Sequence, residues 1–75
     1  MAGDSSVIGR VGELTHATRG QGGPGEVRVK IRGGTEIFLA WSERPLPAGS
    51  PVLVVESRGP RAVGVVPWSD LPDTR

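Results

Sequence analysis

The chain has 75 residues, no cysteine and a nearly even charge balance, with nine basic residues against eight acidic ones. A chain of this length forms a single domain with one small core. The lack of cysteine excludes disulfides and thiolate chemistry, and a net charge of +1 gives no electrostatic basis for non-specific DNA binding. No apolar run approaches the roughly 18 residues of a membrane span, and residues 1–6 lack the features of a secretory signal. We therefore expect a soluble, cytoplasmic domain.

Short β-branched runs separated by glycine and proline predict strands and leave no room for a stable helix. The clearest alternation follows the first long loop, where Val27, Val29 and Ile31 lie on one face of a predicted strand. In the third predicted strand both faces are apolar. Five strands are expected, at residues 6–15, 26–32, 35–41, 52–57 and 62–66.

The predicted turns rest on glycine and proline. Gly9 and Gly12 predict a bend or a bulge in the first strand, and Gly33 with Gly34 predicts a two-residue hairpin turn. Residues 43–51 contain three prolines and predict an ordered loop rather than a helix. Five strands with this spacing favour an all-β fold, a small, partly open Greek-key barrel of the OB type without its usual helix. The domain would cover residues 6–68, between tails at 1–5 and 69–75, and an SH3-like barrel is the main alternative.

The sequence predicts no catalytic residue, metal ligand or cofactor site. His16 is the single histidine, and no serine lies in a strand-turn-helix elbow, so a solvated His16 is the simplest interpretation. Residues 20–25 spell G-x-G-x-x-G, the pattern of a dinucleotide-binding loop. A strand follows this motif where a dinucleotide site requires a helix, so we expect a hairpin loop.

One face of the second strand presents Arg28, Lys30 and Arg32, with Arg10 and Arg19 as potential neighbours. The second and third strands of an OB barrel form the usual oligonucleotide surface. Single-strand binding also needs aromatic rings for base stacking, and the chain has only three aromatic residues. A solvated face with cross-strand ion pairs is the favoured interpretation, and single-stranded nucleic-acid binding is the alternative function.

The two tryptophans support a second interpretation. Trp41 and Trp68 could each close one end of the barrel, or an exposed ring beside Leu46 or Leu71 could form a hot spot for a protein partner. If Phe38 and Ala40 point inward, the opposite face of the same strand points outward. The candidate docking residues are therefore Ile37, Leu39, Trp41 and Trp68.

The order of glycine and valine motifs resembles the soluble C-terminal domain of NfeD-like proteins. The motifs are an opening Gly-x-x-Gly strand at residues 9–12, a strand ending in Ala-Trp-Ser at residues 40–42, and a Pro-Ala-Gly turn at residues 47–49. They are followed by Val-Leu-Val-Val at residues 52–55 and Val-Gly-Val-Val-Pro at residues 63–67. The resemblance spans about residues 7–67.

This resemblance implies a five-stranded OB barrel without the usual helix, and it implies a role in protein docking rather than an enzymatic activity. By this resemblance, NfeD-like proteins are membrane partners of stomatin/flotillin-like scaffold proteins, and some of them carry a serine protease domain. This sequence has neither membrane spans nor a protease domain. We therefore predict a non-enzymatic interaction module that docks to a membrane-scaffold or membrane-protease partner, or that self-associates.

Overall fold

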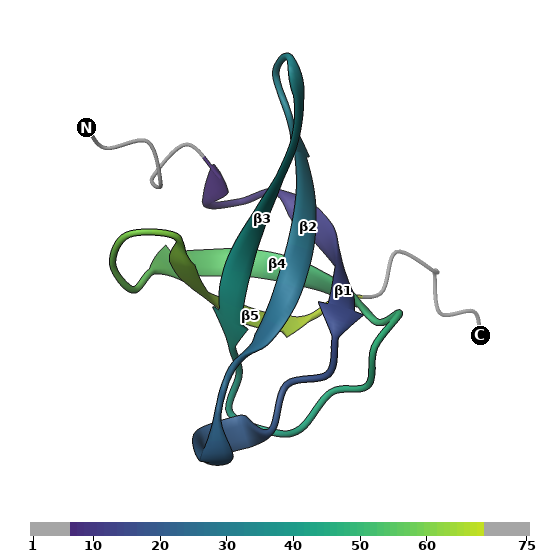
Figure 1. Ribbon diagram of the computed structural model, residues 1–75, viewed down its shortest axis with the longest axis vertical. Helices are drawn as coiled ribbons and strands as arrows, with labels where there is room; N and C mark the ends of the chain where they lie inside the picture. Colours follow the sequence, from purple (N-terminus) through teal and green to yellow (C-terminus); the bar gives the residue numbers. More distant parts are fainter. Residues whose placement is uncertain (1–6, 69–75) are drawn as a thin grey trace, which may run out of the picture.

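The computed structural model describes residues 7–68, which form five strands closed into a barrel (Figure 1). The elements are β1 (Val11–His16), the 3-10 turn η2 (Gly20–Gly22), β2 (Gly25–Ile31), β3 (Gly34–Trp41), β4 (Pro51–Ser57) and β5 (Ala62–Pro67). The predicted all-β, OB-type class is confirmed. The predicted tails and Leu71 lie outside the described residues.

The strands are ordered β1-β2-β3-β5-β4, and pairing of β1 with β4 closes the ring. Four pairings are antiparallel, but β3 and β5 run parallel over three residue pairs, from Leu39 with Ala62 to Trp41 with Gly64. An antiparallel arrangement of all five strands, the simplest arrangement for a small Greek-key barrel, is therefore wrong at one seam. A ring of five strands, an odd number, cannot alternate direction at every pair, so one parallel pair is unavoidable.

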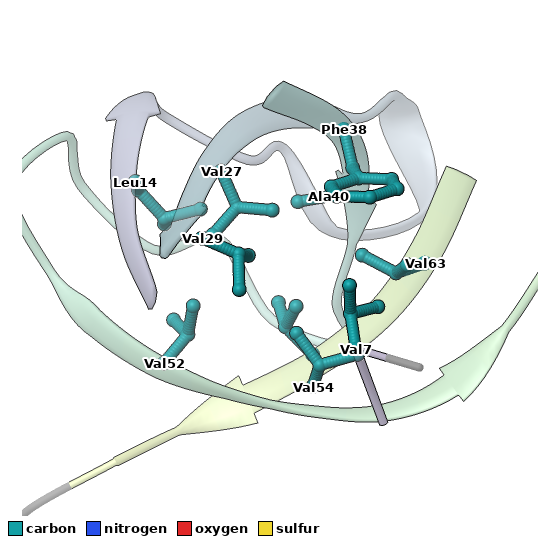
Figure 2. Close-up of a cluster of buried hydrophobic side chains, with 10 residues drawn as sticks. Val7, Leu14, Val27, Val29, Phe38, Ala40, Val52, Val54 and Val63 are labelled. Carbon is teal, nitrogen blue, oxygen red and sulfur yellow. The ribbon is translucent and has the colours of Figure 1, made fainter. Parts of the chain in front are cut away.

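The core fills the inside of this ring with alternate residues of every strand (Figure 2). Most members are valines, which pack well across the narrow space between curved strands. Phe38 supplies the single aromatic ring among them, as the sequence predicts. The core residues are Val7, Leu14, Val27, Val29, Phe38, Ala40, Val52, Val54, Val63 and Val65.

Two bulges turn polar side chains away from this core. In β1 the register shifts between Leu14 and His16, and in β4 it shifts between Val54 and Glu56. Strict alternation would place both His16 and Glu56 on the inward face, where an uncompensated charge is costly. The extra residue of each bulge reverses the phase, so that the imidazole and the carboxylate face solvent.

Most predicted strand ends lie within one residue of the structure, and the larger differences concern β1 and the hairpin turn. The first strand begins at Val11 rather than residue 6, because Val7–Gly9 forms a turn in which Gly9 has a φ of +92°. The bulge of β1 lies after Leu14, not at the glycines. In the β2–β3 hairpin, which projects from the barrel in Figure 1, the turn is Arg32-Gly33.

The hairpin turn is shifted by one residue because the positive φ, +87°, is adopted by Gly33, while Gly34 pairs with Ile31. The loop between β3 and β4 contains no helix, as its prolines predict. The loop between β1 and β2 carries the short turn η2 and leads directly into strand β2, so the predicted hairpin loop is present.

Gly12 allows β1 and β2 to approach closely, and this contact generates the first prediction. A Cβ at Gly12 would lie 2.7 Å from the carbonyl oxygen of Arg28 and 2.8 Å from Cγ2 of Val27. We expect Gly12→Ala to lower the free energy of unfolding by about 2 kcal/mol, because the backbone of β2 must move to relieve the overlap. Urea unfolding followed by tryptophan fluorescence measures this change.

The matched control is Gly34→Ala. A Cβ at Gly34 meets no atom within 4 Å, and the residue does not have a positive φ. Its free energy of unfolding should stay the same or rise slightly. Equal losses in the two variants would show that the close approach at Gly12 does not limit packing.

Candidate functional site

The outer surface of the barrel has two chemically different sides. Most outward side chains of β1 and β2 are charged and form a charged face, whereas outward side chains of β3, β4 and β5 form an apolar face, which exposed Val11 of β1 adjoins through its pairing with Leu53. Members of the apolar face are well exposed, with Leu39 and Val55 each 44% accessible. The charged face consists of Glu13, His16, Glu26, Arg28 and Lys30, and the apolar face consists of Ile37, Leu39, Trp41, Leu53, Val55 and Val66.

The alternation of β3 places its predicted docking residues on the apolar face. Phe38 and Ala40 are buried in the core, so Ile37 and Leu39 point outward. Trp41 is half-buried and lies on the same outward side at the end of the strand. Trp41 is not among the residues of the buried core, so its ring does not fill the barrel centre.

Trp68 is not brought together with these three residues. The backbone N–H of Trp68 donates a hydrogen bond of 3.0 Å to the carbonyl oxygen of Pro51. Trp41 instead pairs with Gly64, which precedes Trp68 by four residues. Four residues of extended strand span about 13 Å. The two tryptophans thus lie near opposite ends of β5.

A groove of about 510 Å³ crosses the apolar face where β3 and β5 diverge. The parallel seam stops at Trp41, whereas β5 continues to Pro67, so the two chains leave space between them. Trp41 lines this groove together with the exposed valines of β4 and β5. Its lining residues are Gly20, Gln21, Trp41, Ser42, Glu43, Val55, Glu56, Arg58, Gly64, Val65 and Val66.

A cationic group already lies against the tryptophan in this groove. The Arg58 guanidinium carbon lies 5.5 Å from the centre of the Trp41 ring, within the range of a cation–π interaction. The same guanidinium forms an ion pair of 3.4 Å with the Glu56 carboxylate. Both charged side chains are about half exposed, so water weakens their attraction.

Gly64 lets the Glu56 side chain cross β5 at the floor of the groove. A Cβ at Gly64 would lie 2.6 Å from Oε2 and 2.7 Å from Cγ of Glu56. Any larger residue would displace this carboxylate. The β4 bulge and Gly64 therefore act together, since the first turns Glu56 outward and the second leaves it room.

Buried Thr18 attaches the proline-rich loop to the barrel and so fixes one wall of the groove. Its N–H donates to the carbonyl oxygen of Leu46 at 3.0 Å, and its Oγ1 accepts from the N–H of Leu46 at 2.9 Å. The Ser42 hydroxyl lies 2.7 Å from the same Oγ1. These bonds position Ser42 and the adjacent Glu43, which line the groove.

The second prediction follows from this anchor. Thr18→Val keeps the shape of the side chain but leaves the N–H of Leu46 without its acceptor, while the Ser42 hydroxyl keeps only its bond to the carbonyl oxygen of Arg44. We expect a loss of about 1–3 kcal/mol in the free energy of unfolding. Chemical denaturation measures it, and amide chemical shifts of Ser42 and Glu43 report the movement of the groove wall.

Thr35→Val is the control, because Thr35 is exposed on the outer side of β3. The substitution there should change the free energy of unfolding by no more than about 0.5 kcal/mol. Identical behaviour of the two variants would contradict the anchoring role of Thr18.

Of the predicted basic residues, Arg28 and Lys30 share the charged face of β2, whereas Arg32 and Arg19 lie beyond its two ends. The Arg28 guanidinium forms a cross-strand ion pair of 3.1 Å with Glu13, in agreement with the solvated face that the sequence predicts. Arg32 lies at the hairpin tip, whereas Arg19 lies in the loop at the other end of β2 and folds over Gly23.

The aromatic rings lie away from this charged face. Phe38 is in the core, and Trp41 is at the far end of β3 from Thr35, the residue that pairs with Lys30. The described residues thus provide no ring on which a base could stack beside Lys30.

The described part of the chain contains no cluster of side chains suited to a metal ion. His16 is exposed and lies 3.2 Å from the Glu26 carboxylate, as a surface residue. Among residues 7–68 no group of three histidine, cysteine or acidic side chains could hold a metal ion. Within the same range no helix has the length and apolarity needed to cross a membrane.

The strand order, the parallel β3–β5 seam and the loop that replaces a helix define a small five-stranded barrel of the OB class. Residues 11–66 match the NfeD C-terminal domain family, and the chain belongs to this family.

A solved relative agrees in fold. The solution structure of the soluble domain of the NfeD protein YuaF from Bacillus subtilis superposes with a TM-score of 0.72 and is 30% identical in sequence. The similarity covers 85% of this chain and 76% of that one. No curated protein sequence matches the chain.

Proposed function

We propose that this domain is a non-enzymatic protein-interaction module and that its apolar face receives a partner protein. The observation that carries the proposal is a group of exposed apolar side chains on β3, β4 and β5, in which Ile37, Leu39, Val55 and Val66 are each at least 40% accessible. The outward side chains of β2 beside this group are charged, and exposed Val11 of β1, which pairs with Leu53, extends the apolar group. Monomeric proteins seldom leave such a patch uncovered, and patches of this kind commonly mark interaction sites.

The family supplies the kind of partner. Membership in the NfeD C-terminal domain family supports a stomatin/flotillin-like scaffold protein as the partner, with a second copy of this chain as the alternative. Trp41 is the expected anchor, because tryptophans in partly desolvated clefts are the commonest hot spots of interfaces. The cytoplasmic location of the domain remains a prediction.

Nucleic-acid binding through Arg28, Lys30 and Arg32 is the weaker alternative. Arg28 is paired with Glu13, and no stacking ring lies among these residues in the described chain. Affinity for mixed single strands should not exceed the roughly 10⁻⁴–10⁻⁶ M of non-specific contacts.

The third prediction tests the docking role in two steps. A photo-crosslinking amino acid at Leu39 of the full chain should capture a protein in native cells, while the same group at Lys30 should not. The captured protein, identified by mass spectrometry and purified, is then titrated onto the purified domain. We expect Trp41→Ala to weaken this binding at least about tenfold, because a hot-spot side chain contributes 2 kcal/mol or more.

Leu39→Ser serves as a second variant, since Leu39 is exposed and its loss should not unfold the barrel. Lys30→Ala is the matched control on the charged face. Sub-micromolar binding of single strands that is lost in Arg28→Ala with Arg32→Ala would replace docking by nucleic-acid binding. Equal capture from Leu39 and Lys30 would also contradict a one-sided docking surface.

A further inference from the structure

The charges around the groove are unequal. Glu43 and Glu56 both line it, and within residues 7–68 Arg58 is the single basic residue among the lining residues. Arg58 is paired with Glu56, whereas the described chain contains no ion pair to Glu43. The rim of the groove therefore has an excess of one carboxylate, which favours a cationic group on whatever enters.

Arg58 identifies where that cation would lie. Its guanidinium is placed between the Trp41 ring, at 5.5 Å, and the Glu56 carboxylate, at 3.4 Å. An aromatic face and a carboxylate together select a guanidinium or an ammonium. Because Arg58 is about half exposed and at the end of β4, its contacts are weak enough to be exchanged for those of an incoming side chain.

The floor of the groove accepts an apolar side chain next to the cation. Gly64 pairs with Trp41 and presents no side chain, and Val66 follows two residues later on the same face of β5. Two residues of a strand span about 6.7 Å. An extended segment lying along β5 has the same repeat, so residues two apart in that segment would meet the Trp41 position and the Val66 position together.

We propose that the groove binds an extended segment of a partner protein that carries a lysine or arginine two residues from a branched apolar side chain. The cation displaces Arg58 from the Trp41 ring and is held by Glu56 and Glu43, while the apolar side chain packs on Val55 and Val66. This inference rests on the proposed docking function and adds to it the chemistry of the partner.

The fourth prediction uses three capped twelve-residue peptides as probes, each with three copies of a four-residue repeat. The repeats are Lys-Ser-Val-Ser, Glu-Ser-Val-Ser and Lys-Ser-Ser-Ser. We expect the first peptide to bind at least about tenfold more tightly than either of the others, because only it supplies both the cation and the apolar group. Two-dimensional NMR titration of the full chain measures this, through the Trp41 indole N–H and the Gly64 amide.

Three variants separate this chemistry from simple apolar contact. Glu43→Lys should weaken binding of the Lys-Ser-Val-Ser peptide at least about fivefold. Arg58→Ala should tighten binding of the same peptide about two- to fivefold, because the peptide no longer competes with an internal guanidinium. Glu13→Lys makes the same charge change on the charged face and should leave the affinity unaltered.

The outcomes distinguish the two proposals. Equal binding of the Glu-Ser-Val-Ser peptide, or weaker binding by Arg58→Ala, overturns the cationic recognition but leaves docking through the apolar face intact. Groove resonances that do not move with any peptide, alongside a partner crosslinked at Leu39, also overturn it. Groove resonances that shift on raising the protein concentration without peptide identify a second copy as the occupant and contradict it as well. Loss of the Leu39 crosslink itself would contradict the docking function.

Discussion

Barrel closure determines which surface of this protein can be functional. The ring closes through a parallel seam of only three residue pairs between β3 and β5, and its interior is filled by ten apolar side chains, most of them valines. A barrel this narrow has space for one face of each strand. Because β3 is apolar on both faces, burial of Phe38 and Ala40 requires Ile37 and Leu39 to be exposed. The apolar face is thus a direct consequence of closing the ring on this sequence.

Much of this fold could be predicted from residue patterns, and the errors have local causes. The alternation at Val27 and Val29 and the prolines after Trp41 predicted strands and a loop correctly. Because two glycines are adjacent at the hairpin, the sequence does not show which of two registers, one residue apart, the strands adopt. The positive φ of Gly33 selects the observed register. The bulge of the first strand was misplaced and the bulge of β4 was not predicted, because alternation alone does not show where one extra residue will be inserted.

The groove could not have been found in this way, because it depends on contacts between strands distant in sequence. The sequence singled out Trp41 but missed Glu56, Arg58, Gly64 and Val66, which the β3–β5 seam and the β4 bulge bring beside it. One signal was available. A glutamate in phase with two core valines of a predicted strand indicates either a buried charge or a bulge, and the bulge has by far the lower cost.

Along β4 and β5, most residues that form the core differ from those that line the groove. In β4, Val52 and Val54 hold the core, whereas Val55 and Glu56, on the far side of the bulge, contribute only to the groove. In β5, Val63 is buried in the core, Gly64 and Val66 line the groove, and Val65 belongs to both. Side chains on the outer face can therefore change with little effect on the core packing. A small barrel of marginal stability can in this way vary the chemistry of its partner while keeping its fold, since selection on the two faces acts on alternate residues.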